Sequence, residues 1–170
     1  MFLSNDGGSP VVFAKSAVIK QSTPELISAL RRLLADVYAM STATQGAHWN
    51  VNGADFAQYH ELFSEIYEDV SGSIDPLAEN ILKIGGLAVA SLSGMQAERT
   101  TTDPVESRDP RVLAAGLATM NDVILGRVIG AFAIANAANE QGIANFLAER
   151  DDMHKKWRWQ LKASLGEPVV

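Results

Sequence analysis

The sequence predicts an all-α protein, a single domain built as a bundle of four long helices. Apolar side chains recur three and four residues apart along four long stretches, and no stretch alternates apolar and polar residues as a half-buried strand does. The chain has 170 residues, 47% of them apolar, which is enough for one domain with its own core. It has no cysteine, which excludes disulfides, zinc-thiolate sites and thiol chemistry.

The first helix is expected over residues 22–49. A hydroxyl cap, an early proline and an acidic first turn stand at residues 22–25, a combination typical of a helix start. The asparagines and the glycine of residues 50–53 break the pattern. The apolar positions between these signals form one stripe, which consists of Leu26, Leu30, Leu33, Val37 and Met40.

The second helix is expected to open near Asp55 and to end at the two glycines of residues 85–86. Pro76 lies inside this stretch, and a proline removes a backbone donor and clashes with the preceding turn. We therefore expect a kink or a short break within residues 72–76. The apolar stripe of this helix consists of Phe56, Tyr59, Phe63, Ile66, Val70, Leu77, Ile81 and Ile84.

Two further long helices follow a long connection, residues 85–108, in which a short helix is expected over residues 87–95. An aspartate and a proline at residues 109–110 cap the third helix. A turn at residues 136–139 separates it from the fourth, which is expected over residues 140–166 and stops at a glycine. Four long helices with one long crossover between the second and the third indicate a four-helix bundle of the ferritin-like type.

The domain organisation follows from these elements. We expect an extended N-terminal arm over residues 1–21, the bundle over residues 22–166 and a short tail over residues 167–170. The N-terminus has neither a basic region nor an apolar one of the signal-peptide kind, and no uninterrupted apolar run reaches the ~18 residues of a membrane span. The expectation is a cytoplasmic protein without a membrane partner. A net charge of −6 weighs against nucleic acid as the main partner.

Two histidines are the first chemical signal. His48 falls in the last turn of the first helix and His60 in the second turn of the second, on either side of a short turn. If the two helices form a hairpin, the two imidazoles lie close together. Further along, Asp75 and Glu79 are four residues apart and share one face of the second helix.

The spacing of these residues sets a geometric constraint. His60 and Asp75 are 15 positions apart, which is roughly 22 Å along a helix at ~1.5 Å per residue, so one ion cannot bind both within one chain. Either there are two half-sites or two chains combine them. In a two-fold dimer with antiparallel second helices, His60 of one chain faces Asp75 and Glu79 of the other. Imidazole with carboxylate suits iron, with manganese and zinc as competitors.

Each signal also has a simpler structural explanation. A single histidine near a turn is usually just hydrogen-bonded, and an acidic pair four residues apart is usually a solvated helix face. Asp75 stands before a proline and is placed to cap a restarted helix. Trp49 and the aromatic residues of the second helix are core residues by pattern alone. We place His154, beside two lysines, on the surface with no metal role. The joint spacing of the four residues is much harder to attribute to chance.

The motifs resemble those of the Dps family, the mini-ferritins named as DNA-binding proteins from starved cells. Residues 47–61 read Ala-His-Trp-Asn-Val-x-Gly-x-x-Phe-x-x-x-His-Glu, and residues 75–79 read Asp-x-x-Ala-Glu. Together they match that family's ferroxidase pattern H-x11-H-x14-D-x3-E. Residues 84–86, Ile-Gly-Gly, and residues 154–161, His-Lys-Lys-Trp-x-Trp-x-Leu, extend the resemblance, which covers about residues 24–166.

The resemblance implies a hollow homo-oligomer of twelve subunits that oxidises Fe(II) with hydrogen peroxide or oxygen and stores Fe(III), which protects against oxidative stress. It implies sites for one or two irons at two-fold interfaces. His48 and His60 would come from one chain and Asp75 and Glu79 from its mate. Trp49 would lie beside the metals, where the family's tryptophan can supply an electron.

One position departs from the family pattern. The family has an acidic residue four positions after its second histidine, and this chain has Ser64 there. A hydroxyl is a poor, neutral ligand for iron compared with a carboxylate. The nearby Glu61, Glu65 and Glu68 do not stand one turn beyond His60. The alternative function is therefore a cage with an impaired ferroxidase site, which acts as a structural or metal-binding shell.

The basic residues do not predict strong DNA binding. The arm carries only Lys15 and Lys20, and the basic end of the fourth helix is flanked by acids, so DNA binding is expected to be absent or weak. A DNA-compacting protein and a plain helical interaction domain remain as two further readings of the sequence. Asp122, Glu140 and Glu149 are possible pore or cavity acids, although a helix surface is their default place.

Overall fold

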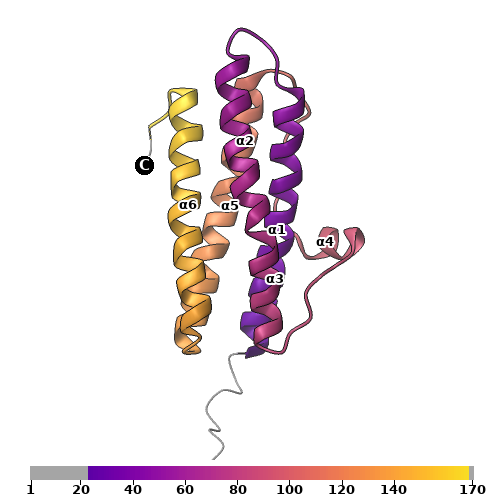
Figure 1. The fold of residues 1–170 in the computed structure, drawn as a ribbon, viewed down its shortest axis with the longest axis vertical. Helices are drawn as coiled ribbons and strands as arrows, with labels where there is room; N and C mark the ends of the chain where they lie inside the picture. Colours follow the sequence, from indigo (N-terminus) through magenta and orange to yellow (C-terminus); the bar gives the residue numbers. More distant parts are fainter. Residues whose placement is uncertain (1–22, 169–170) are drawn as a thin grey trace, which may run out of the picture.

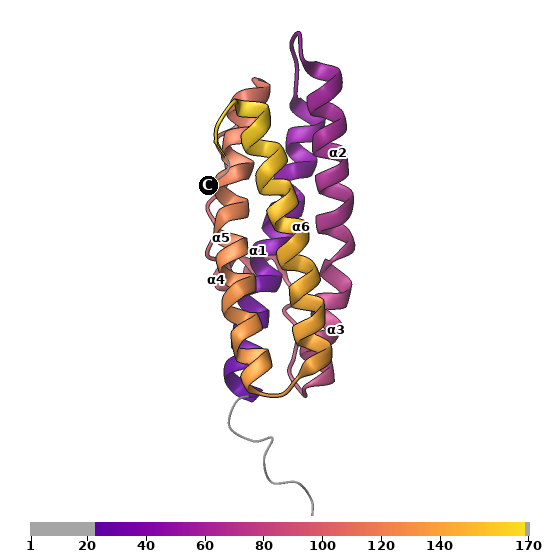
Figure 2. The same cartoon turned by 90° about the vertical axis from the view of Figure 1, so that its left-hand side faces the viewer.

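The computed structural model describes residues 23–168 of the chain, and within them every regular element is a helix. The predicted arm, residues 1–21, lies outside the described residues, as do residues 169–170. The long helices run side by side along the long axis, and the short α4 stands outside the bundle next to α1 (Figures 1 and 2). The helices are α1 (Thr23–Asn50), α2 (Phe56–Gly72), α3 (Ile74–Lys83), α4 (Leu92–Glu98), α5 (Pro110–Ala137) and α6 (Gln141–Leu165).

The first hairpin confirms the predicted bounds and the predicted break. α1 ends at Asn50, and the turn that follows contains Gly53 at φ 121°, a conformation that other residues rarely adopt. The second predicted helix is two helices, α2 and α3, which are separated at Ser73. Pro76 has no N–H to donate to the carbonyl of Gly72, four residues earlier, so the ladder is interrupted there. The Ser73 hydroxyl donates to the Val70 carbonyl at 2.7 Å and closes the end of α2.

The short helix of the crossover lies later than predicted. The sequence predicted it over residues 87–95, but α4 spans Leu92–Glu98. Its start is set by Ser91, whose side-chain oxygen accepts a hydrogen bond from the Gly94 N–H at 3.1 Å. The start of α4 is therefore decided by the N-cap at Ser91 and not by the apolar residues that precede it.

The crossover is held against α1 by polar contacts. Arg31 forms an ion pair with Glu98 at 2.8 Å. The buried Asp36 carboxylate accepts hydrogen bonds from the N–H groups of Thr100 and Thr101 at 2.6 and 2.8 Å. The Thr100 hydroxyl also donates to Asp36 at 2.7 Å. These bonds fix the chain after α4 on the side of α1.

The second half of the bundle follows the predicted signals. Asp109 caps α5 by accepting hydrogen bonds from the N–H groups of Arg111 and Val112 at 2.8 and 3.4 Å. α6 ends at Gly166, the C-terminal cap, whose backbone adopts the left-handed conformation at φ 74°. α5 is long and apolar enough to cross a membrane, but half of its apolar window is buried in the bundle, as in a core helix of a bundle.

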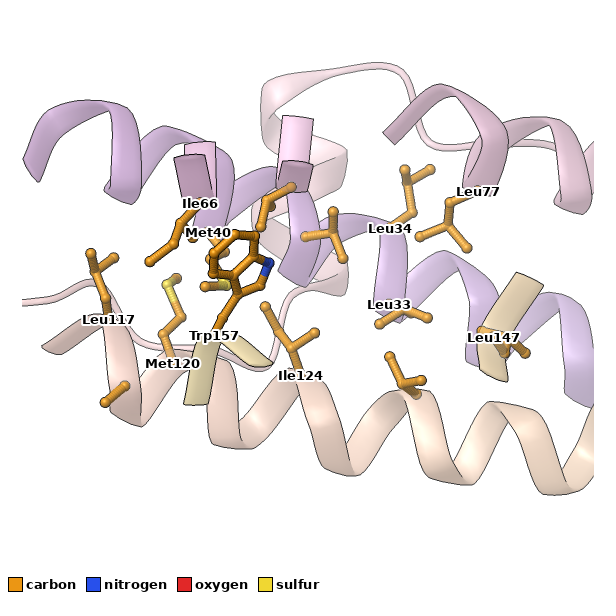
Figure 3. Packing of buried hydrophobic residues seen from close by; sticks show 14 of the residues in the cluster. Leu33, Leu34, Met40, Ile66, Leu77, Leu117, Met120, Ile124, Leu147 and Trp157 are labelled. Atoms are coloured by element: carbon orange, nitrogen blue, oxygen red, sulfur yellow. The ribbon is translucent and has the colours of Figure 1, made fainter. Parts of the chain in front are cut away.

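One core fills the space between the long helices. Trp157 of α6 lies at its centre among side chains of the other helices, including Met40 of α1 and Met120 of α5 (Figure 3). The α1 stripe is buried as predicted. The fully buried large side chains are Trp157, Phe63, Leu26, Leu30, Leu33, Leu34, Met40, Ile66, Leu77, Ile81, Leu117 and Met120.

Three residues lie where the pattern did not place them. The apolar pattern alone placed Trp49 in the core, but it is 69% exposed, because Ala47 faces the core and a residue two positions on points away from it. Phe56, at the first turn of α2, is 44% exposed. His154 was predicted at the surface and is fully buried, because it stands seven positions after Leu147 on the core face of α6.

Candidate metal centre

The two predicted histidines meet at the α1–α2 hairpin. Their rings are stacked, with centroids 3.8 Å apart and planes at 22°. The contact is reciprocal, because His48 Nδ1 donates to the backbone carbonyl of His60 at 3.1 Å and His60 Nδ1 donates to the carbonyl of His48 at 2.9 Å. Phe56 stacks on the other side of His60, with centroids 4.8 Å apart.

These two bonds fix which nitrogen of each neutral ring carries the proton. A carbonyl oxygen can only accept, so each Nδ1 must carry the proton. In a neutral imidazole the other nitrogen, Nε2, then has a free lone pair. This is the arrangement in which a backbone carbonyl orients a metal-binding histidine and sets its tautomer. The hairpin therefore holds His48 and His60 as a fixed pair of imidazoles whose Nε2 atoms are not used by these two bonds.

The predicted carboxylates do not join the histidines within one chain. Asp75 and Glu79 lie on α3, both exposed, and Glu79 is only loosely paired with Lys83 at 3.9 Å. Among residues 23–168 of a single chain there is no group of three histidine, aspartate, glutamate or cysteine side chains able to hold an ion. A single chain thus presents separate nitrogen and oxygen donors at different heights of the bundle.

A polar contact between α1 and α2, in the same hairpin as Ser64, was missed by sequence reasoning. Ser64 is half-buried, one turn beyond His60. Across the helix pair, the Gln45 side-chain amide donates to the phenol oxygen of Tyr67 at 2.9 Å. The signal was present in the spacing, because Gln45 precedes His48 by three residues and Tyr67 follows His60 by seven, close to two helical turns.

A second polar cluster links α2 to α6. Asp69 receives two hydrogen bonds from Arg150, at 2.8 and 2.6 Å, and a third from the Trp157 indole at 2.7 Å. Burial acts to raise the pKa of Asp69, but the bonds from Arg150 and Trp157 outweigh it, and the pKa lies below its ordinary value of 3.8. This carboxylate is fully committed to holding the two helices together.

His154 is the third histidine and has a structural role. Its Nδ1 donates to the Asn121 side-chain oxygen at 2.7 Å, while the Asn121 amide donates to the His154 carbonyl at 2.9 Å. Its Nε2 is buried without a hydrogen-bond partner. Burial, followed by the nearby positive charge of Arg150, lowers the pKa of His154 from 6.5 to about 3.

The other polar features within residues 23–168 offer no comparable set of donors. Asp122, one of the possible pore acids, pairs with Arg158 at 3.0 Å and Lys162 at 3.8 Å. A groove of about 840 Å³ lies between α1, α4 and the chain before α5, and none of the four predicted ligands lines it.

Comparison with known proteins places this chain in a family. The family model described as Ferritin-like domain matches residues 27–168. A DNA protection during starvation protein from Brevibacillus brevis is 30% identical over 86% of this chain and 99% of its own length. The chain belongs to the Dps family of the ferritin-like superfamily. The fold and family predicted from the motifs are thereby confirmed.

Solved Dps structures share the whole bundle. The Dps protein of Vibrio cholerae, described as a member of a broad superfamily of ferritin-like diiron-carboxylate proteins, has a TM-score of 0.81 at 29% identity and covers 85% of this chain and 91% of its own. The Dps protein of Bacillus brevis has a TM-score of 0.80 at 29% identity, with coverages of 86% and 99%. The matches span nearly the full length of both Dps relatives.

Proposed function

We propose that this chain is a mini-ferritin that oxidises Fe(II) and stores Fe(III) inside a closed shell of its own copies, in the cytoplasm. The observation that carries the proposal is the stacked pair His48 and His60, whose Nδ1 protons are bound to backbone carbonyls. Neutral imidazoles with free Nε2 atoms are suitable ligands for Fe(II), which is here the substrate. The oxidant is hydrogen peroxide or oxygen.

The complete site needs two chains. Asp75 and Glu79 are 15 and 19 positions beyond His60, roughly 22 Å or more along the helix axis. A two-fold axis that sets two α2–α3 segments antiparallel brings the carboxylates of one chain to the histidines of the other, twice over. A closed shell of twelve subunits contains such two-fold interfaces, and the exposed Trp49 follows His48 in the last turn of α1.

The residues divide the work by charge. The imidazoles hold Fe(II) without adding charge, whereas the carboxylates of Asp75 and Glu79 attract the ion more strongly as its charge rises to Fe(III). Reduction of hydrogen peroxide to two waters takes two electrons and two protons, and two Fe(II) ions supply one electron each. Where a site holds one iron, Trp49 would supply the second electron. Zinc and manganese compete for the same donors, and the Dps of Listeria innocua was soaked with zinc for its structure.

Ser64 favours the alternative, a shell with an impaired ferroxidase site. Two Fe(II) ions carry four positive charges, and Asp75 with Glu79 offers two negative ones. A neutral hydroxyl at residue 64 adds none. If the second iron does not bind, the shell still binds metal but oxidises Fe(II) slowly.

Stopped-flow oxidation of Fe(II) by hydrogen peroxide separates the two functions. We expect the wild-type assembly to oxidise iron well above the rate in buffer, and His60→Ala to lose most of that excess. Glu61→Gln is the matched control, because Glu61 is exposed beside His60 and does not stand one turn from it. A wild-type rate equal to that in buffer contradicts the ferroxidase proposal and supports the metal-binding shell.

A further inference from the structure

Tyr67 and Gln45 form a polar contact that the proposed site does not yet use. The Gln45 amide donates to the Tyr67 phenol oxygen at 2.9 Å, across the pair of helices that also carries the two histidines. Tyr67 is half-buried on α2. No other hydrogen bond of this phenol is present among the described residues, so its own proton is not committed to a protein acceptor.

The helix geometry places this phenol beside Ser64. At 100° per residue, Ser64 stands about 40° from His60 around α2 and Tyr67 about 20° from it on the other side, so all three share one flank. A long side chain on a helix leans back over the turn that precedes it. The Tyr67 ring is therefore expected to lean toward the turn that contains Ser64. Its bond to Gln45, three residues before His48, fixes the oxygen toward the histidine end of the hairpin.

We propose that Tyr67 is a further ligand of the iron, and that its phenolate binds Fe(III) where this chain lacks the usual acid. The inference rests on the proposed ferroxidase function and deepens it. In the binding step the phenol O–H bond breaks, an Fe–O bond forms and the proton passes to solvent water. No electron moves in this step, because Fe(II) has already been oxidised.

The chemistry of a phenol suits the product more than the substrate. A free phenol keeps its proton at neutral pH and is then a weak, neutral donor to Fe(II). Fe(III) is a harder ion and takes an anionic oxygen, as in haem proteins with a tyrosine ligand. The site thus gains one negative charge as the iron gains one positive charge. Ser64 leaves room for this, since a longer acidic side chain there would occupy the same turn.

Electronic absorption tests the proposal directly, because a phenolate bound to Fe(III) gives a charge-transfer band in the visible range that oxygen and nitrogen ligands of other kinds do not give. The assembled protein is loaded with Fe(II) without oxygen and then oxidised with hydrogen peroxide. The chain has three tyrosines, Tyr38, Tyr59 and Tyr67. We expect the band in wild type and its loss in Tyr67→Phe. The matched control is Tyr38→Phe, which should keep the band. Tyr38 is half-buried on α1 and lies ten residues before His48.

A double substitution separates a ligand from a packing role. In Tyr67→Phe with Ser64→Asp, a carboxylate replaces the phenolate, so the initial oxidation rate should recover without the band. Oxidation of iron by wild type without the band, or a band unchanged in Tyr67→Phe, overturns the role of Tyr67 and leaves the ferroxidase function standing. If wild type does not oxidise iron, both the role of Tyr67 and the ferroxidase function are refuted.

Discussion

Replacing His154 by asparagine should flatten the dependence of stability on pH in mildly acidic solution. His154 is fully buried, and its Nδ1 proton is bound to Asn121 while its Nε2 has no partner. A second proton on Nε2 would place a charge in the core near Arg150. The folded protein therefore takes up this proton only at a pH of about 3, whereas the unfolded chain takes it up at its ordinary pKa of 6.5.

The sign and size of the effect follow from this difference. Because the folded pKa lies below the unfolded one, the free energy of unfolding is highest above pH 6.5 and falls as the pH drops toward 3. One pKa unit corresponds to about 1.4 kcal/mol, so the loss is about 2 kcal/mol between pH 6.5 and pH 5 and about 5 kcal/mol at most over the whole window. The pKa of Asp69 is lowered from 3.8, so its contribution to the free energy of unfolding is lost only below pH 3.8.

Asparagine keeps an amide donor at the position of Nδ1 but does not titrate. His154→Asn should be less stable than wild type at pH 7, because the imidazole volume is lost from the core. Its stability should then change much less between pH 6.5 and pH 5. Urea unfolding at a series of pH values and at one fixed protein concentration measures the two curves, and their difference isolates His154. An equal slope in both proteins, or an imidazole that titrates near pH 6.5 by NMR, would refute the reasoning.

Three further results are expected. Ser64→Asp should raise the affinity for the second iron and quicken the initial oxidation more than twofold, where each ~1.4 kcal/mol off the activation free energy would raise the rate tenfold. Calorimetry and stopped-flow kinetics measure the affinity and the rate. If wild type already binds two irons tightly and the substitution changes nothing, the prediction is contradicted. DNA binding should be absent or weak at about 0.15 M salt in a mobility-shift assay, since the few basic residues are screened there, and strong retardation would count against it. Light scattering should find a closed oligomer of about twelve subunits, whereas a stable monomer of 18.3 kDa could not complete a site.

The helices were predictable because their signals are local. Periodicity and caps placed the ends of α1, α5 and α6, and Pro76 predicted the break that the structure has at Ser73. The start of α4 was missed, since a single capping hydroxyl at Ser91 decided it. Local patterns show which residues share a face, and they leave open how far round the helix the core extends. Trp49 was misplaced for that reason.

The polar interior was not predictable, because its partners are distant in sequence. His154 was assigned by the lysines beside it, yet its environment is set by Asn121, 33 positions away. The residue types at positions 48 and 60 predicted metal ligands. The two carbonyl bonds that fix their tautomers depend on the register of the hairpin, which no single spacing reveals. The bond from Gln45 to Tyr67 depends on the same register.

Complementation between two inactive chains tests most directly whether two subunits share each iron site. One chain carries His48→Ala and His60→Ala, the other carries Asp75→Asn and Glu79→Gln, and each alone should assemble without ferroxidase activity. In a co-expressed random mixture half of the two-fold pairs are mixed and each contains one intact site of two, so about a quarter of the wild-type sites should return. If the mixture stays as inactive as its parents while mixed shells are present, the histidines and the carboxylates do not act together across the interface, and the account is wrong.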